Sequence, residues 1–183
     1  MAEKLKIALF GSSFNPPHVG HVAVLEDLLA KNLFDGIWLL PVYNHAFGKE
    51  LVPFEERVAM LKILIRDLGD MRVAFSEIEK ELGKSPSYSI DTVMELKRRH
   101  PDVEFHMIAG SDVKADLDKW HRIAELKQIL KFHFIPRLGY DEKSPYPKVS
   151  SSEIREKVKR GESLTGLTTP AIVEYITKRK LYS

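Results

Sequence analysis

The chain has 183 residues, of which 44% are hydrophobic and 30% charged, a composition typical of one globular domain. Its net charge is +2. It has no cysteine, and this absence excludes disulfides, thiolate catalysis and cysteine metal sites and favours a reducing, cytoplasmic location. The longest apolar run, IWLLPVY near residue 40, is far shorter than the ~18 residues that span a bilayer, so we expect no membrane partner.

The first half of the chain predicts three strands separated by two helices. The apolar segment LKIALF (5–10) reads as a buried strand, and a helix follows that begins at His18 or Val19. The next strand is GIWLLPV (36–42), then a helix near 54–67, then a strand MRVAF (71–75). Apolar residues recur at helical spacing in the two helices: Val22, Leu25, Leu28 and Leu29 in the first, and Phe54, Val58, Leu61 and Leu64 on the inner side of the second.

The second half continues the same alternation. A helix over 89–99 carries apolar Ile90, Val93, Met94 and Leu96, and it precedes the strand VEFHMIAG (103–110). Helical material through 122–130 leads to a fifth strand, KFHFIP (131–136). A loop over 137–147 with Gly139, Pro145 and Pro147 follows, and helices over about 150–159 and 169–180 complete the pattern.

Strands that alternate with helices at these spacings predict the α/β class. We expect a Rossmann-like, doubly wound parallel sheet of about five strands with C-terminal helices, formed by one domain over 1–183. In such sheets ligands bind beyond the carboxyl ends of the strands. The segments that follow the strands are therefore the candidates for a site: 11–21, 41–50, 76–89, 110–120 and 136–152.

The stretch GSSFNPPHVGH after the first strand has the features of an anion site. Gly11 permits unusual backbone geometry and lets a ligand approach the main chain, and Ser13 follows it. Since His18 and His21 are three residues apart at a helix start, both project from one face, where they can donate hydrogen bonds to phosphate oxygens. An ordinary polar helix start and a zinc site are alternatives, although no third zinc ligand is evident. Neither the Walker loop nor the GxGxxG fingerprint is present.

The stretch VSSSEIR (149–155) starts a helix with three hydroxyls and a guanidinium. Ser150 and Glu153 match a capping box, which is a complete structural explanation by itself. Ser152 and Arg155 share a face, however, and such a pair at a helix N-terminus suits phosphate. From Lys148 onward the sequence contains eight Lys and Arg but only four Asp and Glu. The absence of a basic block with interleaved aromatics favours a small polyphosphate ligand over nucleic acid.

These two stretches carry a family resemblance. Together GSSFNPPHVGH and VSSSEIR resemble the nucleotidyltransferase superfamily with a GxxFxPxHxGH loop and an ISSTxxR motif. Within it the chain most resembles the bacterial nicotinate-nucleotide adenylyltransferases, almost from end to end. The central segments SPSYSIDTVMEL (85–96) and AGSDVKADLDKWHRIAEL (109–126) make the resemblance specific, because many cytidylyl- and adenylyltransferases share the HxGH element alone.

The resemblance implies transfer of AMP from ATP to nicotinate mononucleotide, giving deamido-NAD and pyrophosphate in NAD biosynthesis. The acceptor phosphate attacks the α-phosphorus directly, so no protein nucleophile is required. Catalysis then rests on positioning and charge stabilisation. The expected catalytic residues are His18, His21 and Arg155; Gly11, Ser13, Ser150 and Ser152 join them in binding ATP. Mg²⁺ would accompany ATP and be held mostly by phosphate oxygens, so we name no protein ligand for it.

For the mononucleotide, the resemblance implies that Trp120 stacks on the pyridine ring and that Tyr88 and Ser89 receive its carboxylate, largely through backbone amides. Asp112 would face the ligand from the end of the fourth strand. Each of these residues also has an ordinary role, since a tryptophan after a strand is usually core and SPSYS can simply cap a helix.

One segment departs from the family. Where relatives usually have Pro-Pro-His-Lys after the second strand, this chain has PVYNHAFGKE (41–50). His45 and Lys49 are the candidates to replace those contacts, in a register that the sequence leaves undecided. The departure leaves nicotinamide mononucleotide open as acceptor. Two further functions stay open: adenylyl or cytidylyl transfer to another metabolite such as phosphopantetheine, and non-catalytic regulation through nucleotide binding. A homo-oligomer is compatible with the sequence.

Overall fold

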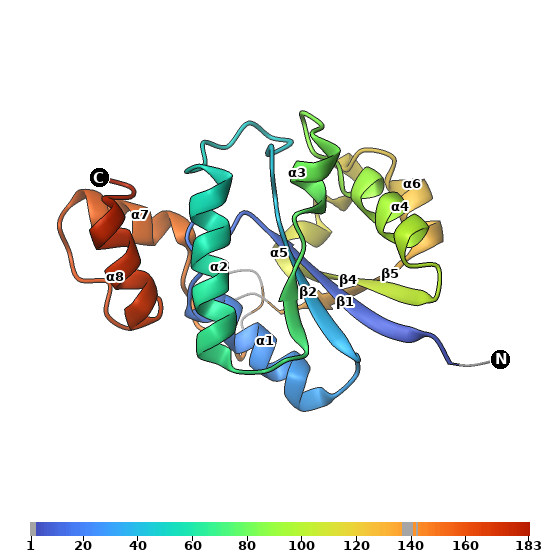
Figure 1. The fold of residues 1–183 in the computed structure, drawn as a ribbon, viewed down its shortest axis with the longest axis horizontal. Coiled ribbons are helices and arrows are strands. Elements are labelled where there is room, and N and C mark those ends of the chain that lie inside the picture. Colours follow the sequence, from blue (N-terminus) through green and yellow to red (C-terminus); the bar gives the residue numbers. More distant parts are fainter. Residues whose placement is uncertain (1–2, 137–140, 142) are drawn as a thin grey trace.

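The computed structural model describes residues 3–136, 141 and 143–183. Its centre is a sheet of five strands, all parallel, in the order β3-β2-β1-β4-β5 (Figure 1). The strands are β1 (Leu5–Ser12), β2 (Gly36–Pro41), β3 (Val73–Phe75), β4 (Val103–Gly110) and β5 (Lys131–Ile135). The predicted Rossmann-like sheet is confirmed, with each strand close to its expected range.

Helices cover both faces of the sheet, so the sheet is doubly wound as predicted (Figure 1). One face packs against α1 (Val19–Lys31) and α2 (Phe54–Leu68), with α7 (Ser151–Lys159) and α8 (Pro170–Arg179) outside α2. The other face packs against α3 (Ile78–Leu82), α4 (Ser89–Arg99) and α6 (Ile123–Ile129). A short helix α5 (Ser111–Lys114) and a 3₁₀ turn (Leu117–Lys119) follow β4.

The central strands are buried on both faces because of these two helical layers. β1 has four consecutive buried residues, Ile7 to Phe10, which is the pattern of a parallel strand between helices. Phe10 pairs in register with Leu39 of β2 and Ile108 of β4, so the three strands reach the same edge of the sheet. That edge is where the predicted site segments begin.

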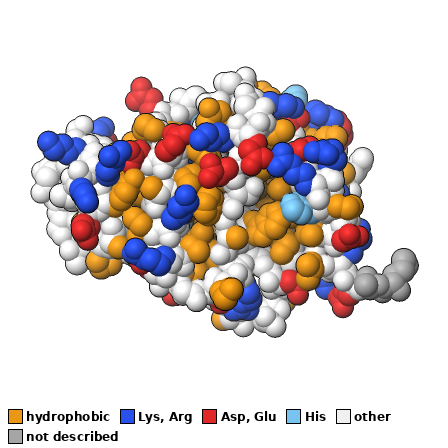
Figure 2. Space-filling view, in the orientation of Figure 1, with side chains coloured by type: hydrophobic (Ala, Val, Ile, Leu, Met, Phe, Trp, Pro, Cys, Tyr) orange, Lys and Arg blue, Asp and Glu red, His pale blue; other side chains and the backbone are white. Residues whose placement is uncertain are grey.

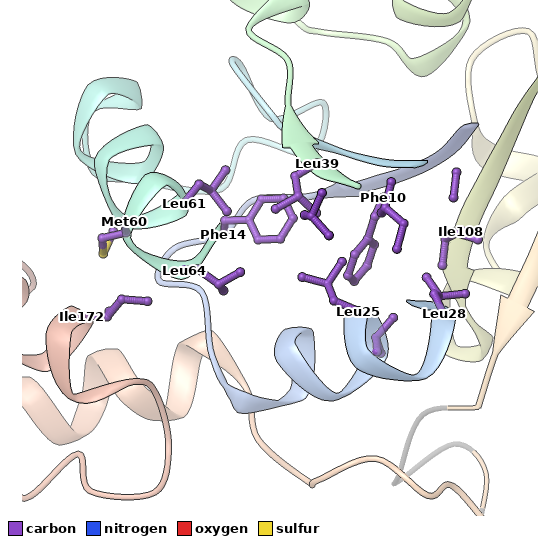
Figure 3. Packing of buried hydrophobic residues seen from close by; sticks show 14 of the residues in the cluster. Phe10, Phe14, Leu25, Leu28, Leu39, Met60, Leu61, Leu64, Ile108 and Ile172 are labelled. Atoms are coloured by element: carbon purple, nitrogen blue, oxygen red, sulfur yellow. The ribbon is translucent and has the colours of Figure 1, made fainter. Parts of the chain in front are cut away.

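The apolar core on the α1 and α2 face extends beneath the loop after β1. Figure 3 shows Leu61 of α2 beside Phe14, and Leu25 of α1 beside Phe10. Ile172 joins the same cluster from α8, which brings the C-terminal helices onto α2. Glu56 of α2 accepts a hydrogen bond from the Tyr175 hydroxyl at 2.8 Å and pairs with Arg179, both on α8. The C-terminal helix is thereby fastened to α2.

Some sequence-based details differ from the structure. Met94 was grouped with the apolar residues of its helix, but it is 49% exposed, because the buried side of α4 is formed by Ile90, Val93 and Leu96. The short helix α3 was not predicted, since five residues are too few for a helical period to show. Part of the predicted loop over 137–147, including Gly139, lies outside the described residues.

Within the described residues, no helix is both long and apolar enough to cross a membrane.

Candidate active site

A cleft of about 1140 Å³ lies at the carboxyl edge of the sheet. Its walls come from the segments that follow β1, β2, β4 and β5 and from the starts of α4 and α7. All thirteen residues predicted from sequence line it: Gly11, Ser13, His18, His21, His45, Lys49, Tyr88, Ser89, Asp112, Trp120, Ser150, Ser152 and Arg155. Residues up to 144 positions apart in the chain thus share one cavity with room for a nucleotide and an acceptor.

The loop after β1 is anchored by Phe14. This residue is fully buried and has a φ of +47°, so the chain turns sharply while its ring enters the core. The expectation for Gly11 was partly wrong, because it lies inside β1 and is not among the glycines with a positive φ. A Cβ at Gly11 would meet no atom within 4 Å, so a glycine there leaves the cleft open for a ligand.

His21 is held in one orientation by the main chain. Its Nδ1 accepts a hydrogen bond from the backbone N–H of His18 at 3.1 Å, and its Nε2 lies 3.3 Å from the Ser12 hydroxyl. Because Nδ1 accepts, the proton of the neutral ring is on Nε2. His21 can therefore donate from Nε2, the nitrogen on the Ser12 side, to an oxyanion in the cleft.

The two histidine rings stack at the start of α1. His18 is the N-cap residue and α1 begins at Val19, one of the two predicted starts; the His18 ring stacks on that of His21 with centroids 3.8 Å apart and planes inclined by 29°. Gly20 makes this arrangement possible, since a Cβ there would come within 3.0 Å of the His18 ring. The spacing HxGH is thus a packing requirement as well as a chemical one.

The start of α7 is fastened to the loop after β1. The Ser150 hydroxyl caps the helix by accepting from the Glu153 N–H at 3.1 Å. Arg155 donates from Nη2 to the Ser152 hydroxyl at 3.1 Å and from Nη1 to the Asn15 carbonyl at 2.9 Å. The capping role and the shared face of Ser152 and Arg155 are both present. A helix N-terminus, hydroxyls and a guanidinium converge next to the histidines, which is an anion-binding arrangement.

The opposite end of the cleft is aromatic. α4 begins at Ser89 with Tyr88 as its N-cap residue, and the Tyr88 ring stacks on His121 with centroids 4.2 Å apart. Trp120 lines the cleft and also packs edge-on against Phe132 with centroids 6.3 Å apart. Its packing in the core and its place in the cleft lining therefore coexist. Asp112, on α5 directly after β4, borders the same cavity.

The loop that departs from the family, 41–50, also lines the cleft. His45 Nδ1 accepts from the Phe47 N–H at 3.1 Å, while Lys49 is exposed. Burial, with the nearby charges of Lys49 and Arg57, lowers the pKa of His45 below its usual value, so His45 is neutral near pH 7 and offers an Nε2–H donor. Both replacement residues are thus at hand for an anionic ligand.

Several residues that line the cleft were not predicted from the sequence. Ser12, Asn15 and Gly20 lie within the motif itself but were not singled out. Glu79 is buried and accepts from the Tyr43 N–H at 2.9 Å; burial raises the pKa of its carboxyl. His121 is adjacent to Trp120 in sequence, and its stacking on Tyr88 depends on a contact between separate segments. Among the described residues, no group of three His, Asp or Glu side chains is arranged to hold a metal ion.

Comparison with known proteins agrees with this geometry. Residues 9–157 match the cytidylyltransferase-like family. The chain belongs to the cytidylyltransferase-like family. Its relatives include two probable nicotinate-nucleotide adenylyltransferases. That of Myxococcus xanthus is 38% identical, with the match covering 100% of this chain and 97% of the relative. That of Anaeromyxobacter dehalogenans strain 2CP-1 is 34% identical, with the match covering 97% of this chain and 96% of the relative.

The fold of this cytidylyltransferase-like chain is also similar to a solved structure. Plasmodium falciparum nicotinic acid mononucleotide adenylyltransferase, complexed with NaAD, superimposes with a TM-score of 0.84 at 24% identity over 97% of both chains. The family expected from the two motifs is confirmed, and with it the nucleotidyltransferase class of the enzyme.

Proposed function

We propose that this enzyme transfers AMP from ATP to nicotinate mononucleotide, giving deamido-NAD and pyrophosphate. One observation carries the proposal: a phosphate-binding end and an aromatic end belong to a single cleft. The phosphate end consists of His18, His21, Arg155 and the hydroxyls of α7. The aromatic end consists of Trp120 and the start of α4. The named activity of the full-length relatives supports the same reaction.

The transfer needs no protein nucleophile. An oxygen of the acceptor 5′-phosphate forms a bond to the α-phosphorus of ATP, and the bond from that phosphorus to the bridging oxygen of the pyrophosphate breaks. The leaving group gains negative charge as this happens. Donors fixed beforehand stabilise that charge best, and the Nε2–H of His21 and the Arg155 guanidinium are both held by bonds to the loop after β1.

ATP enters as its magnesium complex. The phosphate oxygens supply most of the ligands of Mg²⁺, which prefers oxygen and keeps several waters. The protein's part is to surround the triphosphate with Ser13, Ser150, Ser152 and Arg155, while Gly11 leaves space at the end of β1. His18 lies against His21 and borders the same phosphates.

The pyridine ring lies against Trp120, and its carboxylate lies at the start of α4. There the backbone amides of Tyr88 and Ser89 and the positive end of the helix dipole favour an anion. Asp112 and Lys49 border the rest of the mononucleotide. The cleft takes walls from residues 10 to 159, which supports treating 1–183 as one nucleotidyltransferase domain.

The test is an acceptor panel. The protein, Mg²⁺ and ATP are incubated in turn with nicotinate mononucleotide, nicotinamide mononucleotide and phosphopantetheine, and pyrophosphate release is measured. We expect the highest kcat/KM with nicotinate mononucleotide. A preference for another acceptor would move the assignment to that metabolite, and no release with any acceptor, at normal ATP binding, would indicate a nucleotide-binding regulator.

A further inference from the structure

Arg57 is a charged side chain within the core. It lies in the first turn of α2, only 1% of it is exposed, and it is the largest of the fully buried side chains. Removing a guanidinium from water is costly unless its N–H groups find partners. Arg57 does not line the cleft, so the reaction described above gives it no contact with substrate.

The partners of Arg57 are two backbone carbonyls from separate loops. Its Nη1 donates to the Ser13 carbonyl at 2.9 Å, in the loop after β1. Its Nε donates to the Val52 carbonyl at 3.1 Å, where the loop between β2 and α2 ends. A planar guanidinium with N–H groups in fixed directions can span two such acceptors, which a lysine ammonium does poorly.

No ion pair among the described residues neutralises this cation. The two acidic residues beside it on α2 have other partners, since Glu55 pairs with Lys80 and Glu56 pairs with Arg179. The guanidinium lies instead over the Phe54 ring, 5.2 Å from its centroid. The side chain is therefore committed to the bridge between the two loops.

Asn15 joins the same two loops a second time. Its side-chain oxygen accepts from the Val52 N–H at 3.3 Å, and its amide nitrogen donates to the Glu50 carbonyl at 3.4 Å. The Tyr182 hydroxyl donates to the same side-chain oxygen at 3.0 Å. In the proposed function the loop after β1 borders the triphosphate, and the loop after β2 carries Lys49 of the mononucleotide site. The bonds of Arg57 and Asn15 therefore connect the ATP side of the cleft with the mononucleotide side.

We propose that Arg57 is a positioning residue for the transfer reaction, because its bridge holds the ATP side of the cleft in register with the acceptor side. The inference rests on the proposed function. A misplacement of about 1 Å between reacting groups can cost on the order of a hundredfold in rate. Loss of the bridge should therefore lower kcat much more than it weakens the binding of ATP alone.

The experiment compares Arg57→Met and Arg57→Lys with the unaltered protein. For each, kcat and both KM values are measured together with the dissociation constant of ATP, and circular dichroism reports folding. We expect kcat to fall by about tenfold or more in both variants, with the ATP dissociation constant changed less than about threefold. Arg57→Lys separates the bridge from the charge: an unchanged kcat in that variant would overturn the proposal.

Arg66→Met is the matched control. Arg66 lies on the same helix, is exposed, and among the described residues bonds only the neighbouring Asp67, so its loss should leave kcat unchanged. The unaltered protein tests the parent proposal separately: if it transfers AMP to no acceptor the function is wrong, whereas an active protein with an unaffected Arg57→Lys variant refutes only the role of Arg57.

A measurement on the unaltered protein covers the case in which both variants unfold. In protein labelled with ¹⁵N-arginine, the Nε–H of Arg57 should exchange slowly with water, because it is buried and bonded to Val52. Rapid exchange of that resonance would show that the bridge does not persist in solution, and would overturn the proposal.

Discussion

His21 is held at both ring nitrogens, and we propose that its Nε2–H donates to a phosphate oxygen. We expect His21→Ala to lower kcat by ~100-fold or more, since one donor aimed at transition-state charge contributes about 3 kcal/mol. Steady-state kinetics and circular dichroism check this. His100→Ala is the control, because His100 follows α4 and lies outside the cleft. A near-normal kcat in folded His21→Ala would contradict the role.

Another histidine pair, outside the cleft lining, should affect stability. His106 Nδ1 lies 2.9 Å from His133 Nε2, and His106 Nε2 lies 3.2 Å from Glu104, which pairs with Lys131 at 2.9 Å. Burial lowers the pKa of both histidines below the ordinary 6.5; for His106, Glu104 opposes this shift while His133, Lys131 and Lys6 add to it, and for His133, Lys131 adds to it.

These depressed pKa values predict acid sensitivity. The folded state prefers neutral rings, so their contribution is complete above pH 6.5 and is lost as pH falls below 6.5 towards the folded pKa values. The free energy of unfolding, measured with urea from pH 7.5 to 5, should therefore decrease. The double variant His106→Gln, His133→Gln should show a flatter dependence; an equally steep one would assign the loss to other groups.

At the scale of elements, α7 is the part that we propose holds the triphosphate. Arg155→Ala removes a charge-assisted contact worth roughly 1.5–3 kcal/mol. We expect the KM for ATP to rise by about tenfold to a hundredfold, at ~1.4 kcal/mol per decade, while the KM for the mononucleotide changes little. Lys157→Ala on the same helix is the comparison, because Lys157 bonds Glu162 and lies outside the cleft. A change confined to the mononucleotide KM would place α7 on the acceptor side.

The start of α4 predicts acceptor selectivity. Nicotinate and nicotinamide mononucleotide differ only in carboxylate against amide, and amide donors with a helix dipole favour the carboxylate. An amide NH₂ would face protein donors and leave them unpaired, a mismatch that discriminates strongly. We expect kcat/KM to favour the nicotinate form. Trp120→Ala should raise KM for both acceptors without changing their ratio. A ratio near one in the unaltered enzyme would point to the 41–50 loop.

For the whole molecule, the sequence predicted what depends on local pattern. The central strands read as continuous apolar runs because helices cover both faces, and the parallel sheet then predicted where the site segments meet. Other features depend on contacts that no local pattern records. The Arg57 bridge joins carbonyls 39 positions apart, and the stacking of Tyr88 on His121 joins two separate segments. Burial of α4 on one side alone likewise left Met94 exposed.

Charge is also distributed unevenly over the whole molecule. Figure 2 shows basic side chains gathered over the end formed by α7 and α8, where the excess of Lys and Arg after residue 148 lies. Acidic and basic side chains are more evenly mixed over the rest of that face. This basic end lies next to the proposed phosphate site, the phosphate cradle, which the start of α7 forms with the loop after β1. Positive charge there raises the local concentration of polyanions, so the association rate of ATP should fall as ionic strength increases.

The cradle joins residues near one end of the chain to residues near the other, since Arg155 bonds the Asn15 carbonyl and Ser151 bonds the Pro16 carbonyl. A ribosome makes these partners at different times, because all five strands are translated before α7. The sheet can thus assemble while the nucleotide pocket is still incomplete. On the proposed function, competence to bind ATP should therefore arise only after the C-terminal part of the chain has been made.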